Sequence, residues 1–147
     1  MSLNDALKRH ELHSRPGELL FARESRGGRR SYVSMHPSDA WKETKSQPSA
    51  HLYEVLTGKC SLYLDIEWKC KSKPNGEHLV IDQIANYTIK VLSTMLTCKC
   101  TYTAVTSSGP VIGGYKCSWH VHIHTPGVCW QDASAVGDFV SDHLSHF

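Results

Sequence analysis

Asp65 and Glu67 stand two positions apart inside the apolar run of residues 62–68. Successive side chains of an extended strand point to opposite faces, so this spacing puts both carboxylates on one face. Two adjacent carboxylates repel each other unless a cation neutralises them, and carboxylate oxygens are the ligands that Mg²⁺ and Mn²⁺ prefer. The pair therefore predicts a site for one of these ions. An exposed acidic face on an edge strand is the alternative.

A second polar strand face is predicted for residues 115–124, where polar and apolar side chains alternate over ten positions. One face carries a cation, a hydroxyl and three imidazoles: Lys116, Ser118, His120, His122 and His124. Such groups suit phosphate oxygens, because lysine supplies a point charge and the hydroxyl and imidazoles can donate hydrogen bonds. An amphipathic strand with a histidine-rich solvent face is the alternative, and no role is assigned to His122 or His124.

The segments around these strands predict an α+β fold. Strands are expected at 51–56 and 59–68, joined by a hairpin at Thr57-Gly58, and at 101–107. Apolar residues at helical spacing predict a helix over 79–96, and another helix is expected from Asp132 to the end. Upstream, we expect a helix-prone lead (1–20), a turn (26–29), a short strand around Tyr32, a helical turn (38–42) and a loop (45–50). Loops are expected over 71–77 and 108–114.

Composition predicts one ordinary globular domain, with 147 residues, 40% hydrophobic and 20% charged residues, and a net charge of +2. No apolar run is long enough to span a membrane and no signal segment follows Met1, so we expect an intracellular protein. The six cysteines are then expected as thiols. Cys98, Cys100, Cys117 and Cys129 are predicted to be buried thiols and not zinc ligands, because their spacings match no familiar zinc-ligand pattern.

Placed together, the two polar strands resemble the archaeo-eukaryotic primase superfamily, and most closely its primase-polymerases, the PrimPol family. The first motif of that family, Asp-x-Glu, corresponds to residues 65–67, and the second, Ser-x-His, to residues 118–120. The resemblance covers roughly residues 27–140. It implies a core similar to an RNA-recognition-motif sheet with packed helices. Residues 1–50 would form a preceding N-terminal α/β unit, and residues 51–147 the start of the catalytic core.

The resemblance also implies an activity: DNA primase and DNA-directed polymerase. A 3′-hydroxyl would attack the α-phosphate of a nucleoside triphosphate and pyrophosphate would leave, making or extending primers on single-stranded DNA in replication restart or damage tolerance. Asp65 and Glu67 would be catalytic and hold Mg²⁺ or Mn²⁺. The nucleotide would be bound by Ser118, His120, Lys116 and Arg30. A monomer is expected, nuclear or mitochondrial in a eukaryote, or viral.

The family's third motif is a further aspartate downstream of the second. Asp132, Asp138 and Asp142 lie in no matching context, so we expect this chain to be the N-terminal part of a longer primase-polymerase. Two alternatives stay open. One is a metal-dependent nuclease or phosphatase in which Asp65, Glu67 and His120 bind a metal that activates water. The other is a non-catalytic nucleic-acid-binding module with a primase fold.

Overall fold

The computed structural model describes residues 1–25, 27–47 and 51–147, which divide into an N-terminal unit (1–57) and a C-terminal unit (58–147). The described residues form four helices and two antiparallel sheets, so the α+β class is confirmed. In this described part of the chain, each helix is too short or too polar to cross a membrane.

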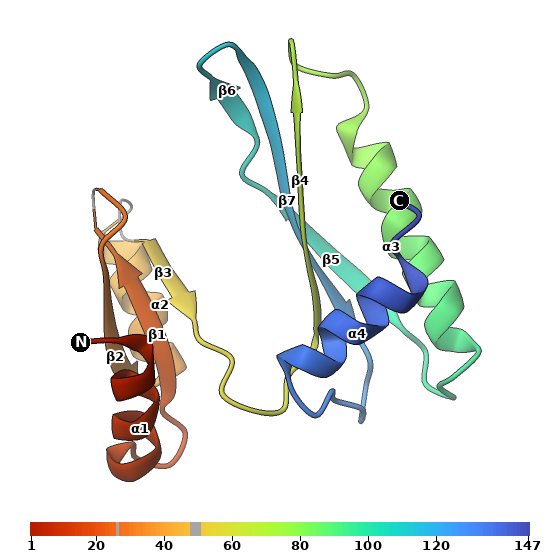
Figure 1. Ribbon diagram of the computed structural model, residues 1–147. Helices are drawn as coiled ribbons and strands as arrows, with labels where there is room; N and C mark the ends of the chain where they lie inside the picture. Colours follow the sequence, from red (N-terminus) through yellow and green to blue (C-terminus); the bar gives the residue numbers. More distant parts are fainter. Residues whose placement is uncertain (26, 48–50) are drawn as a thin grey trace. The chain divides into compact units, whose positions relative to one another are not determined.

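The N-terminal unit contains a three-stranded antiparallel sheet in the order β2-β1-β3 (Figure 1). Its elements are α1 (Leu3–His13), β1 (Leu19–Glu24), β2 (Arg30–Met35), α2 (Pro37–Ser46) and β3 (His51–Glu54). A capping box between Ser2 and Asp5 starts α1, satisfying backbone N–H groups that a helix leaves unpaired. Of the helix-prone segment predicted over residues 1–20, only Leu3–His13 is helical. The central strand β1 was not predicted.

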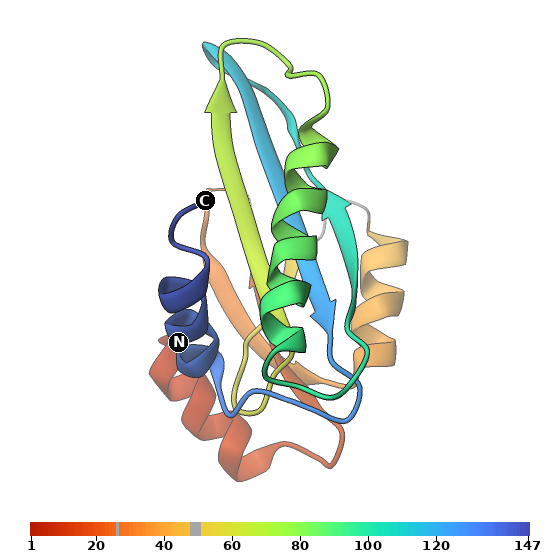
Figure 2. The ribbon, with the colours of Figure 1, turned by 90° about the vertical axis from the view of Figure 1, so that its right-hand side faces the viewer.

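The C-terminal unit contains a larger sheet in which β7 is central. Its elements are β4 (Leu62–Cys70), α3 (Glu77–Ser93), β5 (Thr101–Thr106), β6 (Gly109–Val111), β7 (Gly114–His124) and α4 (Ala133–His143). The order is β4-β7-β5, with β6 also paired to β7, and every pairing is antiparallel. Figure 2 shows α3 lying along one face of this sheet.

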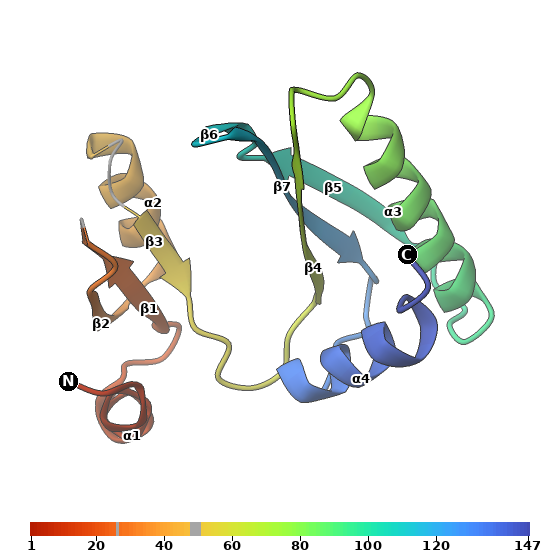
Figure 3. The same cartoon turned by 45° about the horizontal axis from the view of Figure 1, so that its top comes forward.

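The core of the C-terminal unit lies between that face and both of its helices (Figure 3). Leu62, Leu64, Val121 and Ile123 point into it from the two long strands and are almost fully buried. They pack with residues of α3 and α4 in one cluster: Ile81, Ile84, Ala85, Leu92, Val136, Phe139 and Leu144. Because strand side chains alternate, burying this face leaves Asp65 and Glu67 on the other face, as their spacing predicts.

The predicted hairpin at Thr57-Gly58 is wrong. Strand β3 pairs with β1 and strand β4 pairs with β7, so the two strands belong to different sheets. A short turn signal reports only local conformation, whereas pairing is decided by which partners bury the apolar face of each strand.

Three predicted segments differ in detail from the structure. The helical turn at 38–42 is part of the ten-residue helix α2, and the loop expected over 45–50 begins inside that helix, which ends at Ser46. The loop expected over 108–114 contains strand β6. A Cβ at Gly114 would collide with the carbonyl oxygen of Cys70, so glycine lets β7 begin close against β4 there. Residue 26 of the predicted turn and residues 48–50 of the predicted loop lie outside the described residues.

Candidate functional site

The pairing of β4 with β7 places the two predicted motifs directly opposite each other. In this register Asp65 faces His120, and Glu67 faces Ser118. Directly opposed residues on one face of an antiparallel pair have Cβ atoms about 5 Å apart, close enough for side-chain contact. The first and second motifs therefore form one polar cluster, although 50 residues of chain separate them.

Of the two carboxylates in this cluster, Glu67 has the shorter contacts with neighbouring side chains. Its Oε1 atom lies 2.6 Å from Lys116 Nζ and accepts a hydrogen bond from Ser118 Oγ at 3.1 Å. These two contacts, with Lys116 the stronger, hold the pKa of Glu67 below its ordinary value. The side chains of Lys116 and Glu67 stay 37% and 45% exposed, so the ion pair remains open to solvent and to ligands.

Asp65 has a looser environment than Glu67. Its Oδ1 atom lies 3.6 Å from His120 Nε2, beyond ordinary hydrogen-bond distance, and its side chain is 53% exposed. The ring of Tyr63 lies 5.7 Å from that of His120, measured between centroids. Asp65 is therefore the carboxylate that an incoming cation reaches with the least rearrangement.

Ser118 is held by two serines that follow β5, one bound to its side chain and the other to its backbone. Ser107 Oγ donates to Ser118 Oγ at 3.0 Å, and the backbone N–H of Ser118 donates to Ser108 Oγ at 3.0 Å. Ser118 is buried as a result, with 4% of its surface exposed. A hydrogen-bond chain from Ser107 through Ser118 to Glu67 thus fixes the second motif against the first.

Glu77 supports the same strand from the opposite face, and sequence reasoning missed it. This first residue of α3 accepts a hydrogen bond from Trp119 Nε1 at 3.3 Å, and Trp119 packs against the core as its position in the alternation predicts. Burial and a hydrogen bond to Glu77 raise the pKa of the Cys117 thiol to about 12. The available signal was weak, since one acidic residue in a first helical turn is common.

All six cysteines are free thiols in the described structure. Cys117 is buried as predicted, and Cys60 is buried as well. Cys98 and Cys100 are only half-buried and Cys129 is exposed, so the prediction of burial is wrong for Cys129 and overstates the enclosure of the other two. Cys98 and Cys100 lie in the loop between α3 and β5. A loop buries its side chains less than a strand within the sheet does.

The donor atoms and the exposure of Asp65 and Glu67 decide whether they suit a divalent cation. Both offer hard carboxylate oxygens on one face, and both are about half exposed, so their chemistry fits Mg²⁺ or Mn²⁺. Lys116 occupies the cationic position beside Glu67. Among residues 1–25, 27–47 and 51–147, no group of three or more His, Cys, Asp or Glu side chains could hold a metal. The described residues thus present two carboxylates on one face, without a third ligand beside them.

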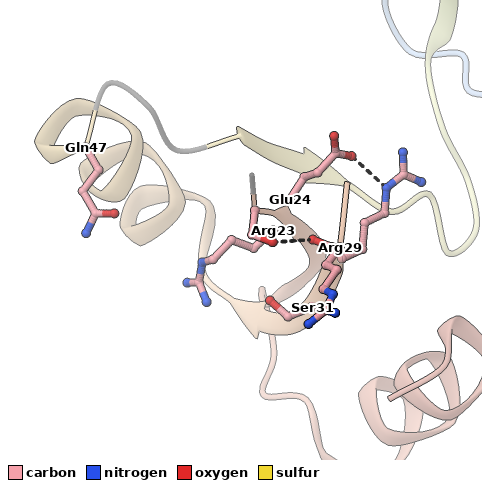
Figure 4. Close-up of a pocket in the computed structure, with 7 residues that line it drawn as sticks. Arg23, Glu24, Arg29, Ser31 and Gln47 are labelled. Atoms are coloured by element: carbon pink, nitrogen blue, oxygen red, sulfur yellow. Dashed lines mark hydrogen bonds and ion pairs between the residues drawn. The ribbon is translucent and has the colours of Figure 1, made fainter. Parts of the chain in front are cut away.

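Arg30, the remaining predicted site residue, belongs to the N-terminal unit. It begins β2 opposite Glu24, and its Nε lies 3.0 Å from Glu24 Oε2. An open pocket surrounds it (Figure 4) and is lined by Arg23, Glu24, Ser25, Arg29, Arg30, Ser31 and Gln47. Arg23 is bound to Glu43 through two hydrogen bonds of 2.7 Å. The pocket therefore combines cationic side chains with carboxylates that partly neutralise them.

No family model matches the chain, and no curated protein matches its sequence. Function is therefore inferred from the register and contacts of five polar residues of β4 and β7: Asp65, Glu67, Lys116, Ser118 and His120.

Proposed function

We propose that this chain carries the nucleotide-binding and metal-binding part of a DNA primase/polymerase of the archaeo-eukaryotic primase type. Its reaction would be transfer of a nucleotide from a nucleoside triphosphate to a 3′-hydroxyl on a single-stranded DNA template. The observation that carries the proposal is the register, which sets Asp65 against His120 and Glu67 against Ser118 on one open face. Two carboxylates lie there beside groups that could bind phosphate oxygens, and phosphoryl transfer depends mainly on such positioning and charge.

Each residue of the cluster has a distinct task under this proposal. Asp65 and Glu67 would hold Mg²⁺ or Mn²⁺, which when bound neutralises charge on the transferring phosphoryl group. His120 would donate a hydrogen bond to a phosphate oxygen. Lys116 and the Ser118 hydroxyl, which both contact Glu67 in this structure, would turn from it to the triphosphate. Phosphoryl transfer depends mainly on such positioning and charge, so a preformed cluster on a stiff sheet is well suited to it.

The topology of the C-terminal unit supports a core similar to an RNA-recognition motif. Its chain order is strand, helix, strand, strand, helix if the short β6 is left aside, and both helices contribute to one core on one sheet face. The order β4-β7-β5 matches the first, third and second strands of a split βαβ pattern. In such folds the face away from the helices is available for nucleic acid.

A second candidate is a non-catalytic module that binds single-stranded DNA. The ion pair between Lys116 and Glu67, at 2.6 Å, favours it, because an internal cation already neutralises one of the two carboxylates. Such a module would bind DNA equally well with and without a divalent cation.

The test is calorimetric titration of deoxyadenosine triphosphate into the chain with Mn²⁺ and with EDTA. We expect binding that needs Mn²⁺ and weakens at least about tenfold in an Asp65→Asn, Glu67→Gln double variant, since both ligands lose their charge. The control is Asp138→Asn, Asp142→Asn, which removes two exposed carboxylates from α4 and should change affinity less than about twofold.

Equal binding by the two double variants would reject the metal assignment. DNA binding that ignores Mn²⁺, with no nucleotide binding, would favour the non-catalytic module. Incubation with a primed template and Mn²⁺ separates the hydrolytic alternatives, because a nuclease or phosphatase releases cut strand or free phosphate instead of a longer primer.

A further inference from the structure

The polar face of the C-terminal sheet continues past the two carboxylates, towards the start of β4. Tyr63 of β4 lies directly opposite His122 of β7, and His122 is paired on its other side with Thr103 of β5. The next position along β7 is His124, opposite Thr101. Tyr63 lies two positions from Asp65, and His122 and His124 lie two and four positions from its partner His120, so all three share the face of Asp65. Thr103 and Thr101 share that face because they pair directly with His122 and His124.

Ring contacts give this region a defined shape. The Tyr63 and His122 rings meet edge to face, with centroids 4.9 Å apart, and His124 Nε2 lies 3.0 Å from Thr103 Oγ1. His122 and His124 are exposed and Tyr63 is half-buried. Val105, opposite His120 on the same face, is 64% exposed. We call Tyr63 and His122 the aromatic row; with Val105 beside it, the row offers planar and apolar surface to solvent.

The charges along the face are ordered. Lys69 and Lys116 lie opposite each other at one end, the two carboxylates follow, and the aromatic row comes after them. The row itself contains no carboxylate. Successive same-face positions on a strand are about 7 Å apart, which is close to the spacing between neighbouring nucleotides of an extended single strand. Lys116 and the rings of Tyr63 and His122 therefore lie on opposite sides of Asp65, and His120 lies level with it.

We propose that the aromatic row binds the terminal bases of the single-stranded DNA whose 3′-hydroxyl reaches the carboxylates. This inference rests on the proposed function, since it names the partner strand of that same site. Every base has a flat π-face, so stacking on tyrosine and histidine rings holds a strand without reading its sequence. Threonine and histidine groups beside the row supply hydrogen-bond donors for sugar and phosphate oxygens.

The experiment measures fluorescence anisotropy of a short labelled oligothymidylate with the whole chain and four variants. Tyr63→Ala and His122→Ala each remove one ring and should weaken DNA binding about fivefold to a hundredfold. Tyr63→Phe keeps the ring and should bind within about twofold of the parent. The matched control is His78→Ala, an exposed histidine on α3, which packs against the other face of the sheet.

Deoxyadenosine triphosphate binding with Mn²⁺, measured on the same variants, separates this inference from the proposed function. A DNA loss at least about fivefold larger than the nucleotide loss supports the aromatic row. DNA binding of His122→Ala equal to that of His78→Ala overturns the inference, and it leaves the proposed function standing if the parent binds nucleotide with Mn²⁺. If the parent binds no nucleotide with Mn²⁺ while these variants still lose DNA binding, the row is a single-strand binding site only and the nucleotidyl-transfer proposal fails.

Discussion

At the scale of single residues, the Glu67 carboxylate joins the two motifs, because this residue of the first motif contacts Ser118 of the second. Lys116 and Ser118, both from β7, contact the same oxygen atom of this β4 residue. An exposed ion pair of this kind contributes little to folding stability, because solvent screens it. Its effect on the carboxyl group is clearer: the Lys116 ammonium lowers the pKa of Glu67, so Glu67 stays ionised to a lower pH.

Replacing Lys116 with methionine should raise the pKa of Glu67 towards its ordinary value, because the Lys116 contact is the main cause of the lowering. The folded-state pKa of the parent lies below that of the unfolded chain. The stabilisation is therefore complete above the unfolded-state pKa and is lost as the pH falls through the folded-state pKa. The variant should therefore lose less stability from Glu67 as the pH falls. Carboxyl carbon NMR against pH measures the pKa of Glu67 in the folded parent and in the folded variant.

Lys69→Met is the matched control for this titration. Lys69 lies opposite Lys116 in the register, but no contact of Lys69 contributes to the pKa shift of Glu67. A Glu67 pKa that moves equally in both variants would show that general positive charge, and not the direct ion pair, causes the lowering.

The spacing of Asp65 and Glu67 was enough to predict a shared face, because alternation is a local property of an extended chain. The contact of Glu67 with Lys116 could not be predicted, since it needs the register of two strands remote in sequence. The support from Glu77 was missed for the same reason: it depends on where α3 starts relative to β7.

At the scale of elements, helix α3 anchors the sheet that positions the site. Its buried side chains are Ile81, Ile84, Ala85, Thr88 and Leu92, and the Thr88 hydroxyl is satisfied by the Ile84 carbonyl at 2.7 Å. The helix was predictable from its period of apolar residues, which extends over four turns. The pairing of β3 with β1 was not, because β3 is short and mostly exposed and its partner was not expected as a strand.

Leu92→Ala should lower the free energy of unfolding by about 2–5 kcal/mol, because Leu92 is 1% exposed and the truncation leaves a cavity in the core. Leu79→Ala makes the same chemical change on the same helix at a residue that is 57% exposed, so it should cost less than about 1 kcal/mol. Urea unfolding followed by circular dichroism measures both values. Similar losses at the two positions would contradict the core assigned to α3.

At the scale of the molecule, the hydrophobic cluster beneath the site is built entirely from the C-terminal unit, from Cys60 to Leu144. The five polar residues of β4 and β7 also belong to this unit, and Arg30 belongs to the other. A site whose strands and supporting core share one unit needs no residue of the other unit to keep its register. The two units can then differ in stability while the cluster stays intact.

Residues 58–147 expressed alone should therefore fold cooperatively, because the fragment keeps the complete cluster and all three strand pairings of its sheet. Thermal unfolding followed by circular dichroism should show one sigmoidal transition. The same fragment carrying Val121→Asp is the control, since an unpaired carboxylate at a fully buried position should abolish that transition. A parent fragment that melts without a transition would mean that the cluster cannot form by itself. A folded fragment that binds Mn²⁺ and deoxyadenosine triphosphate would place the minimal nucleotide site on β4 and β7, and Arg30 would then add affinity without being required.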